Sequence, residues 1–433
     1  MKRAIRHIFL TLAVMALWAA LMFAGTMYGW WHAPIAEHGG TQVYLDAVKG
    51  ELDTEFVGNF ALAVMEEGQV EAELVHSAGA EVDRNTVFQV ASLSKWVSAF
   101  GVMKLVEQGL LDLDAPASTY LTRWQLPPSD FDNDQVTVRR ILSHTAGLAD
   151  GLGYSGFEPG TPTQPIEESL TKASDADEGI SGSVHVGMEP GSGFEYSGGG
   201  YTLLQLLVEE VTGQTFASFM KESILAPLEM NHSSYVWDDT TGLRLAEFYN
   251  GDGSEATHYR YTSLAATSLY TSLHDLEVFF QVFLVGNDGE PIGRGVLSPE
   301  TIRMMREPHA KTMGIDIWGL GTILYAPAEN DDFIIGHDGR STPPINTAVR
   351  LDPQSGNGII VLETGNALLA TRLASEWVFW KTGKVDLTLF TMGTDGMKSA
   401  VGTGWMVILV GSVLLGVVGF FRKRRRTSPA NNS

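Results

Sequence analysis

The sequence predicts an α+β domain in which helices flank an antiparallel sheet and a mostly helical lobe is inserted into it, together with two transmembrane helices. Three observations predict this architecture. Strand-like stretches lie early and late in the chain, a largely helical region separates them, and an uncharged stretch long enough to span a membrane lies at each end. The cleft between the sheet and the inserted lobe is the expected ligand site.

The N-terminal end places three basic residues before the uncharged stretch Ile8 to Trp31. At about 1.5 Å per residue, this stretch can cross a hydrocarbon layer of about 30 Å. A cleaved signal peptide has the same basic start and apolar middle, but the length and the lack of a clear small-residue cleavage site favour an uncleaved anchor. Residues 1–31 are therefore predicted to be a cytoplasmic tip and a membrane anchor or signal helix.

The C-terminal end repeats the pattern in reverse. Residues 405–421 are uncharged and are followed by the basic run 422–426, which is costly to translocate and therefore stays in the cytoplasm. We expect residues 32–383 to form the folded domain, 384–404 a linker, 405–421 a transmembrane helix and 422–433 a cytoplasmic tail. The predicted location is a bacterial cytoplasmic membrane, with the domain on its periplasmic or extracellular side.

Charge and composition exclude several classes of function. The two ends hold eight of the 29 Lys and Arg and none of the 51 Asp and Glu, which leaves 21 basic against 51 acidic residues between positions 32 and 421, a net charge of −30. Such a domain repels nucleic acid, so no nucleic-acid partner is expected. Because the chain has no cysteine, disulfides, thiol catalysis and cysteine-ligated zinc are excluded.

Within the domain, period-two alternation predicts strands at 59–70 and 71–75, with a turn at Glu67-Gly68. A buried helix is expected from Ser92 to Gln108. The middle of the chain is predicted to be helix and loop, and strands return only late. The expected middle and late elements are helices at 137–142, 201–211 and 368–380, a flexible acidic stretch at 164–183, and strands at 333–336, 347–351 and 358–362.

Ser92 and Lys95 lie three residues apart where a strand-like run turns into the buried helix. Residues three apart share a helix face, so the lysine can take the serine proton, and the free N–H groups of a helix start can bind an oxyanion. The same spacing occurs at Ser169/Lys172 and Ser218/Lys221, in the acidic stretch and in a surface-like segment. The position of Ser92, rather than the spacing, makes it the candidate nucleophile.

Two later motifs supply the other expected parts of the site. In "FEYSGGGY" (194–201), Tyr196 precedes a glycine run and a helix, where a phenol can project into a cleft. In "IIGHDGR" (334–340), an apolar strand ends in His337-Asp338-Gly339. Taken alone, the tyrosine has a simpler interpretation as a packed side chain beside a turn, and the histidine as a structural or exposed residue.

Together and in this order, these motifs resemble those of the serine β-lactamase and penicillin-binding-protein superfamily, in its class C-like branch of hydrolases and esterases. The resemblance extends from about residue 45 to about residue 383. Further matching landmarks are "GLLDLDAP" (109–116), "ILSHTAGL" (141–148), "EPGSGFEYS" (189–197), "ILAPLEM" (224–230) and "TSLYTSLHDLEVFF" (267–280).

The resemblance implies that Ser92 is the acylated nucleophile and that Lys95 and Tyr196 share the roles of general base and acid. It also implies an oxyanion hole made by the backbone N–H groups of Ser92 and Arg340, and no metal or organic cofactor. The resemblance assigns substrate binding to three further positions, Gly198, His337 and Gly339.

Two positions depart from the family pattern. Gly198 stands where the second motif usually has an asparagine that holds the substrate amide, and His337 stands where β-lactamases usually have a lysine. Lys381-Thr382-Gly383 spells the usual third motif but follows the last helix, so we interpret it as a helix end. These departures favour a small ester or amide over a β-lactam.

The predicted function is therefore a membrane-anchored serine hydrolase of esterase type. A D-amino-acid peptidase or a weak β-lactamase remains an alternative, since Arg340 can supply a carboxylate-binding charge. A penicillin-binding receptor or sensor that is acylated without turnover is the alternative from another class. The expected partners are a small ester, amide or peptide substrate and a membrane crossed twice.

Overall fold

The computed structural model describes residues 2–149, 152, 154–237 and 242–427. It divides into two compact units. Residues 35–381 form the larger unit, and the smaller one is drawn from the residues before 35 and after 381.

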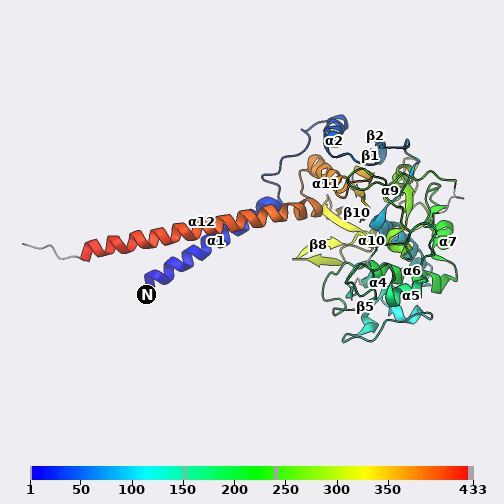
Figure 1. The fold of residues 1–433 in the computed structure, drawn as a ribbon, viewed down its shortest axis with the longest axis horizontal. Coiled ribbons are helices and arrows are strands. Elements are labelled where there is room, and N and C mark those ends of the chain that lie inside the picture. Colours follow the sequence, from blue (N-terminus) through cyan, green and yellow to red (C-terminus); the bar gives the residue numbers. More distant parts are fainter. Residues whose placement is uncertain (1, 150–151, 153, 238–241, 428–433) are drawn as a thin grey trace, which may run out of the picture. The chain divides into compact units, whose positions relative to one another are not determined.

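The larger unit is built on one sheet of eight antiparallel strands, in the spatial order β2-β1-β12-β11-β10-β9-β8-β7 (Figure 1). Strand β1 (Phe60–Glu66) lies between β2 (Gln69–His76) and β12 (Gly358–Thr364). The first two strands of the chain therefore complete the sheet beside its last strand, which confirms the predicted architecture. The other strands of the sheet are β7 Ala310–Thr312, β8 Ile315–Trp318, β9 Ile323–Pro327, β10 Phe333–Ser341 and β11 Ile345–Leu351.

Both faces of this sheet are covered. Along β1, Ala61 and Ala63 belong to the same buried cluster as Phe100 of the nucleophile-bearing helix, whereas the alternate residues Phe60 and Leu62 are buried outside that cluster. Successive side chains of a strand point to opposite faces, so each face carries its own apolar layer. Burying one such large side chain contributes about 1.5–3 kcal/mol, which fixes the register of the strand.

The inserted lobe between β2 and β7 is mainly helical, as expected. Its helices are α3 Ser94–Glu107, α4 Val138–Leu142, α5 Ile166–Lys172, α6 Gly198–Thr212, α7 Phe216–Met220, α8 Leu264–Thr267, α9 Leu273–Gln281 and α10 Pro299–Arg306. Short helical turns are η1 Ala91–Leu93, η2 Ala117–Tyr120, η3 Asn133–Gln135 and η4 Lys221–Leu225. Two small strand pairs complete the lobe: β3 Val87–Gln89 with β6 Tyr270–Ser272, and β4 Leu148–Ala149 with β5 His185–Val186.

Several elements differ from the sequence prediction. The stretch predicted to be flexible contains α5, the late strands are preceded by β7, β8 and β9, and a helix α2 (Thr41–Glu55) precedes β1. The three extra strands are only three to five residues long, too short for a period-two pattern to stand out. Helix α2 packs on α11 (Leu369–Thr382), where the Tyr44 hydroxyl donates to the Leu373 carbonyl at 2.5 Å.

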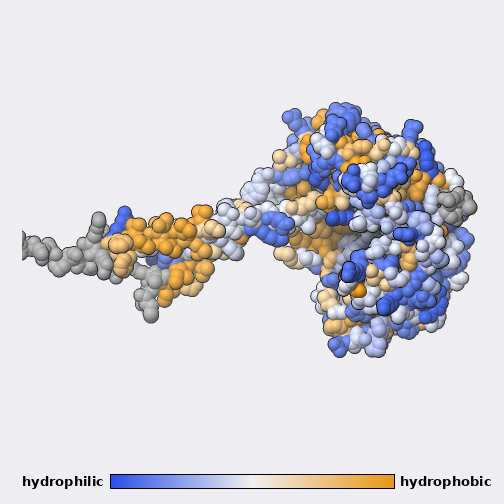
Figure 2. All heavy atoms as spheres, viewed as in Figure 1, coloured by the Kyte–Doolittle hydropathy of each residue, from blue (hydrophilic) through white to orange (hydrophobic). Residues whose placement is uncertain are grey.

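The smaller unit pairs α1 (Lys2–Met27) with α12 (Leu387–Thr427), which lie side by side in Figure 1. Its segments Ile5–Met27 and Leu387–Arg422 are long and apolar enough to cross a membrane, and Figure 2 shows a continuous hydrophobic surface along part of the helix pair. The indole N–H of Trp18 donates to Ala400 O at 3.1 Å. The stretch predicted as a linker, 384–404, is helical from Leu387 onward, so it is not an irregular tether.

Candidate active site

Ser92 lies on a tight turn between β3 and α3. The residue before it, Ala91, has φ +46°, a left-handed conformation that is costly for a side chain other than glycine. Ser92 is half-buried, while Leu93 and Ser94 on either side of the helix start are fully buried. The surrounding structure therefore holds a strained turn that leaves the serine, and not its neighbours, in contact with solvent.

Lys95 is 1% exposed and points back at the serine. Its Nζ donates to Ser92 Oγ at 3.1 Å and to Ala266 O at 2.9 Å, and it lies 5.0 Å from the ring centroid of Tyr196. An amine in hydrogen-bond contact with a hydroxyl is placed to accept the hydroxyl proton. The structure thus brings together the three residues that the sequence predicted as catalytic.

Tyr196 immediately precedes Ser197, whose side chain caps α6 by accepting from Gly200 N at 3.0 Å. The cap fixes the direction in which the chain enters the helix. Tyr196 is 37% exposed, so its ring lies at the border between the buried lysine and solvent.

His144 contacts Tyr196 and both of its neighbours in the chain, a role that the sequence did not predict. Its carbonyl accepts from Glu195 N at 2.8 Å, its Nδ1 accepts from Ser197 N at 3.0 Å, and its ring lies 4.4 Å from the Tyr196 ring. Burial, helped by the nearby Lys95 charge, holds the pKa of His144 well below its ordinary value, so the ring is neutral and Nδ1 stays an acceptor. The only sequence signal was its place in the landmark "ILSHTAGL".

The third motif lies on β10, beside the turn that carries Ser92. Strand β9 pairs with β10 only as far as Gly336, and beyond that point β10 runs along η1. A Cβ on Gly339 would lie 2.0 Å from Val90 O and 2.3 Å from Thr347 Oγ1. The lack of a side chain at Gly339 therefore allows the close approach of the strand to the nucleophile turn, while its role in substrate binding stays a prediction.

His337 is buried, with its ring centroid 5.5 Å from that of Trp318. Its Nδ1–H donates to Asp338 O at 2.6 Å. Burial, with the Lys95 charge adding to it, lowers the pKa of His337 to about 3, so the side chain is uncharged at neutral pH. It does not replace the cation that a lysine would supply at this position.

Arg340 is the penultimate residue of β10 and has an exposed side chain. Its main chain continues the edge of the strand that faces the nucleophile turn. An N–H at such an edge and an N–H at a helix start are the two kinds of donor that an oxyanion hole uses. The contribution of the Ser92 and Arg340 N–H groups to such a hole remains a prediction.

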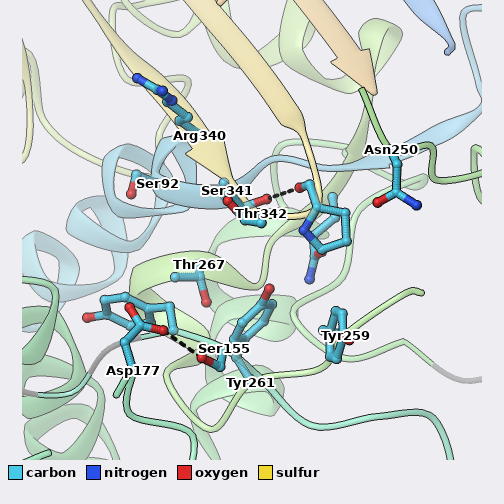
Figure 3. Close-up of a pocket in the computed structure, with 14 residues that line it drawn as sticks. Ser92, Ser155, Asp177, Asn250, Tyr259, Tyr261, Thr267, Arg340, Ser341 and Thr342 are labelled. Atoms are coloured by element: carbon cyan, nitrogen blue, oxygen red, sulfur yellow. Dashed lines mark hydrogen bonds between the residues drawn. The ribbon is translucent and has the colours of Figure 1, made fainter. Parts of the chain in front are cut away.

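A cavity of about 740 Å³ opens at Ser92. Figure 3 shows Ser92 and Arg340 on one side of it, and Tyr259 and Tyr261 across from them. Of the three positions predicted to bind substrate, none is among the described residues of its wall. The wall consists of Gln89, Ala91, Ser92, Tyr154, Ser155, Asp177, Asn250, Tyr259, Tyr261, Thr267, Arg340, Ser341, Thr342 and Pro343.

The other Ser-x-x-Lys stretches have different surroundings. Ser169 is 1% exposed inside α5, whereas Lys172 is exposed at the end of that helix, so Ser169 is a packed side chain rather than part of a flexible stretch. Ser218 and Lys221 are both exposed, and the Ser218 hydroxyl accepts from Thr215 Oγ1 at 2.9 Å. Neither serine lines the cavity described above.

The Lys381-Thr382-Gly383 stretch ends α11, as the sequence analysis expects. Lys381 Nζ makes an ion pair with Glu66 Oε1 at 2.8 Å, and Gly383 has φ +69°, the left-handed conformation of a helix C-cap. The lysine is thus paired at the end of β1 and is not among the residues that line the cavity.

The family model described as Beta-lactamase matches residues 47–377 of the chain. Protein flp of Staphylococcus aureus strain MRSA252 is 23% identical over 298 residues, which are 67% of this chain and 55% of that protein. Penicillin-binding protein 4* of Bacillus subtilis strain 168 is 34% identical over 149 residues, 34% of this chain and 30% of that protein. The chain therefore spans about half the length of the first relative and less of the second.

A solved structure of an octameric penicillin-binding protein homologue from Pyrococcus abyssi is similar with a TM-score of 0.64. The similarity covers 80% of this chain and 78% of that one, at 23% sequence identity. The fold is therefore of the β-lactamase/transpeptidase type, with the antiparallel sheet and helical lobe described above.

Proposed function

This chain belongs to the Beta-lactamase family, and from that premise we propose that it is a membrane-anchored serine hydrolase that cleaves a small ester or amide through an acyl-enzyme. The observation that carries the proposal is the 3.1 Å hydrogen bond between Lys95 Nζ and Ser92 Oγ at the wall of the cavity. A nucleophile in contact with its base is the part of the site that acyl transfer requires first.

In the proposed reaction, Ser92 Oγ attacks the substrate carbonyl carbon while Lys95 and Tyr196 take up its proton. The backbone N–H groups of Ser92 and Arg340 bind the oxyanion of the tetrahedral intermediate. The C–O or C–N bond then breaks, and the proton passes to the leaving alcohol or amine. A water molecule, deprotonated by the same groups, attacks the acyl-enzyme and releases the carboxylate and free Ser92.

Two features of the site favour esters over β-lactams as substrates. The third motif offers a buried, uncharged His337 in place of a fixed cation, and Gly198 carries no side chain that could hold a substrate amide. Neither feature disturbs the contact between nucleophile and base. The missing cation and the missing side chain at position 198 therefore weaken the binding of an uncharged ester less than the binding of a substrate with a carboxylate and an amide.

A second candidate is acylation by penicillins or by D-alanyl-type peptides, with or without turnover. It is favoured by the similarity to a protein named as penicillin-binding and by the place of Arg340, a residue with an exposed side chain, among the residues that line the cavity. A receptor that stays acylated would show the same labelling of Ser92 as a hydrolase, but no release of product.

The test uses the full chain in detergent, with p-nitrophenyl acetate, a penicillin and a fluorophosphonate as probes. We expect many turnovers of the ester, labelling by the fluorophosphonate, and loss of both in Ser92→Ala. Ser218→Ala is the matched control, because it removes an exposed serine with the same lysine spacing and should leave both intact. A stable penicillin adduct without ester turnover would favour the receptor, and labelling that survives Ser92→Ala would refute the hydrolase.

The membrane part of the proposal rests on the two long apolar helices and on the basic residues at the N-terminal end of the first and the C-terminal end of the second. Both ends are proposed to lie in the cytoplasm, with residues 32–383 on the opposite side. The test is trypsin treatment of sealed vesicles of known orientation, since the run 422–426 offers cleavage sites. Cleavage of the tail in right-side-out vesicles would contradict the proposed orientation.

A further inference from the structure

The phenol of Tyr154 fills the space beside the Gly198 backbone. A Cβ built on Gly198 would lie 1.8 Å from the Tyr154 hydroxyl oxygen and 2.6 Å from Cζ of that ring. Gly198 is the first residue of α6 and has ordinary helical geometry, so its backbone does not require glycine. The phenol of Tyr154 requires it, because it fills the space into which any side chain at position 198 would project.

Tyr154 also lines the cavity that contains Ser92. Two further tyrosines, Tyr259 and Tyr261, belong to the same cavity and face Ser92 across it in Figure 3. We call these three side chains the tyrosine wall. Aromatic side chains offer large, flat contact surfaces and have few rotatable bonds to immobilise when a ligand binds.

The two segments that form the tyrosine wall are joined to each other. Phe157 and Arg260 exchange both backbone hydrogen bonds, at 2.8 and 2.9 Å. Gly156 lies between Tyr154 and Phe157 in the sequence. A Cβ on Gly156 would come within 2.8 Å of the Tyr261 ring, so the segment that carries Tyr154 packs closely on the segment that carries Tyr261. The wall is therefore formed before a substrate arrives, and Tyr261, which is 5% exposed, is held by the surrounding protein.

We propose that the tyrosine wall is the acyl-group subsite of this enzyme and that Tyr154 is its specificity-determining residue, selecting acyl groups with a flat apolar part such as an arylacetyl group. The inference rests on the proposed ester or amide hydrolysis, and it names the substrate class of that same site. The acyl carbonyl is attacked at Ser92, and the aromatic part of the acyl group stacks on the tyrosine rings.

The experiment compares the kcat/KM of p-nitrophenyl phenylacetate and p-nitrophenyl acetate, which share a leaving group, in the full-length protein. The wild type should favour the phenylacetate about tenfold, because one buried apolar group contributes about 1–3 kcal/mol to discrimination. Tyr154→Ala and Tyr154→Leu should each lower that ratio at least about fivefold. Tyr120→Ala, in the turn η2 and not among the described residues of the cavity wall, is the matched control and should leave the ratio unchanged.

A second arm tests the shared space. Gly198→Ala should lower both the phenylacetate activity and the melting temperature, and adding Tyr154→Leu should restore the melting temperature, because the clash is gone. Such non-additive effects of two substitutions on the melting temperature are expected for residues in contact. If the two substitutions act additively, the inferred packing of Tyr154 on Gly198 is wrong.

The outcomes separate this inference from the proposed function. Turnover of both esters with a ratio that Tyr154→Leu and Tyr154→Ala leave unchanged would overturn the tyrosine wall as acyl subsite while leaving the hydrolase intact. No turnover of either ester by the wild type, with Ser92 unlabelled by a fluorophosphonate, would overturn the proposed function and this inference with it.

Discussion

The turn that carries Ser92 and the tyrosine wall bound the same cavity, yet they are built in opposite ways. The residues on both sides of Ser92 are buried, and hydrogen bonds connect the turn to several elements. Ser94 Oγ donates to Ala91 O at 2.6 Å and accepts from Leu269 N at 2.9 Å, and Val90 O accepts from Thr347 Oγ1 at 3.0 Å. The tyrosine wall is formed by loop segments that two backbone hydrogen bonds join.

We expect this difference in construction to separate the residues that set the reaction rate from those that set the choice of substrate. The strained conformation at Ala91 persists because buried hydrogen bonds from β11 and from the segment between α8 and β6 hold the residues around it. A change in the turn is therefore expected to affect the rate for every substrate. A change in the loop segments is expected to affect the choice among substrates, since loops accept substitution more readily than packed elements do.

The largest expected effect follows removal of the base. Lys95→Ala should lower kcat for p-nitrophenyl acetate about a thousandfold or more, because the serine proton then has no acceptor in contact. Lys221→Ala, the exposed lysine with the same spacing, should leave kcat unchanged. Steady-state rates of the two variants measure this difference, and wild-type activity in Lys95→Ala would show that Lys95 is not the base.

Gly339→Ala should have the next largest effect, about a hundredfold in kcat/KM, since a shift of about 1 Å at a reacting group has a cost of that order. The added methyl meets the backbone oxygen of Val90, so the strand and the nucleophile turn must move apart. Ester kinetics and a melting curve measure the loss. Equal kinetics in Gly339→Ala would mean that the contact between β10 and the turn does not set the rate.

His144→Phe should lower kcat about tenfold to a hundredfold with little change in KM, because the Ser197 N–H loses its acceptor while the ring stacking on Tyr196 is kept. His144→Asn, which retains an acceptor, should recover part of the loss. A drop in stability alone, without the selective change in kcat, would show that His144 has only a structural role.

Low pH should reduce the free energy of unfolding of the domain because His337 is buried in its uncharged form. Its pKa is about 3 in the folded protein against an ordinary value of 6.5, so below pH 6.5 the unfolded chain binds a proton that the folded chain does not. The stabilisation is full above pH 6.5 and falls as the pH drops toward 3, by about 2 kcal/mol between pH 7 and pH 5. Urea unfolding at pH 7, 6 and 5 measures the slope, which His337→Gln should reduce.

Lys381→Met should have the smallest effect. The ion pair with Glu66 is partly exposed, and such pairs contribute about 0.2–1 kcal/mol to stability. Esterase activity should stay at the wild-type level, as measured beside the melting temperature. A large loss of activity would reopen the assignment of Lys381-Thr382-Gly383 as a helix end.

Much of this site could be predicted because its parts are local in sequence. Ser92 and Lys95 are one helical turn apart, and Tyr196 precedes a glycine run and a helix, so each leaves a short-range pattern. The antiparallel sheet was predictable for the same reason, since β1, β11 and β12 have clear alternation or apolar runs. Strands β7 to β9 are too short to leave such a pattern, and they were missed.

The roles of the glycines and of His144 were not predictable in this way. Gly339 and Gly198 matter because of Val90 and Tyr154, residues more than 40 positions away along the chain. His144 contacts Tyr196 over a similar separation. Sequence spacing carries no information on such contacts, since the approach of two segments is set by the packing of the whole domain.

Local spacing, motif order and hydropathy encode the family resemblance, the three catalytic candidates and the two apolar ends, so these could be predicted from the sequence. The burial of the uncharged His337, the approach of β10 to Val90 at Gly339, and the filling of the space beside Gly198 by Tyr154 depend on the folded domain. Burial and steric exclusion arise from atoms that distant segments bring together, so no local pattern records them.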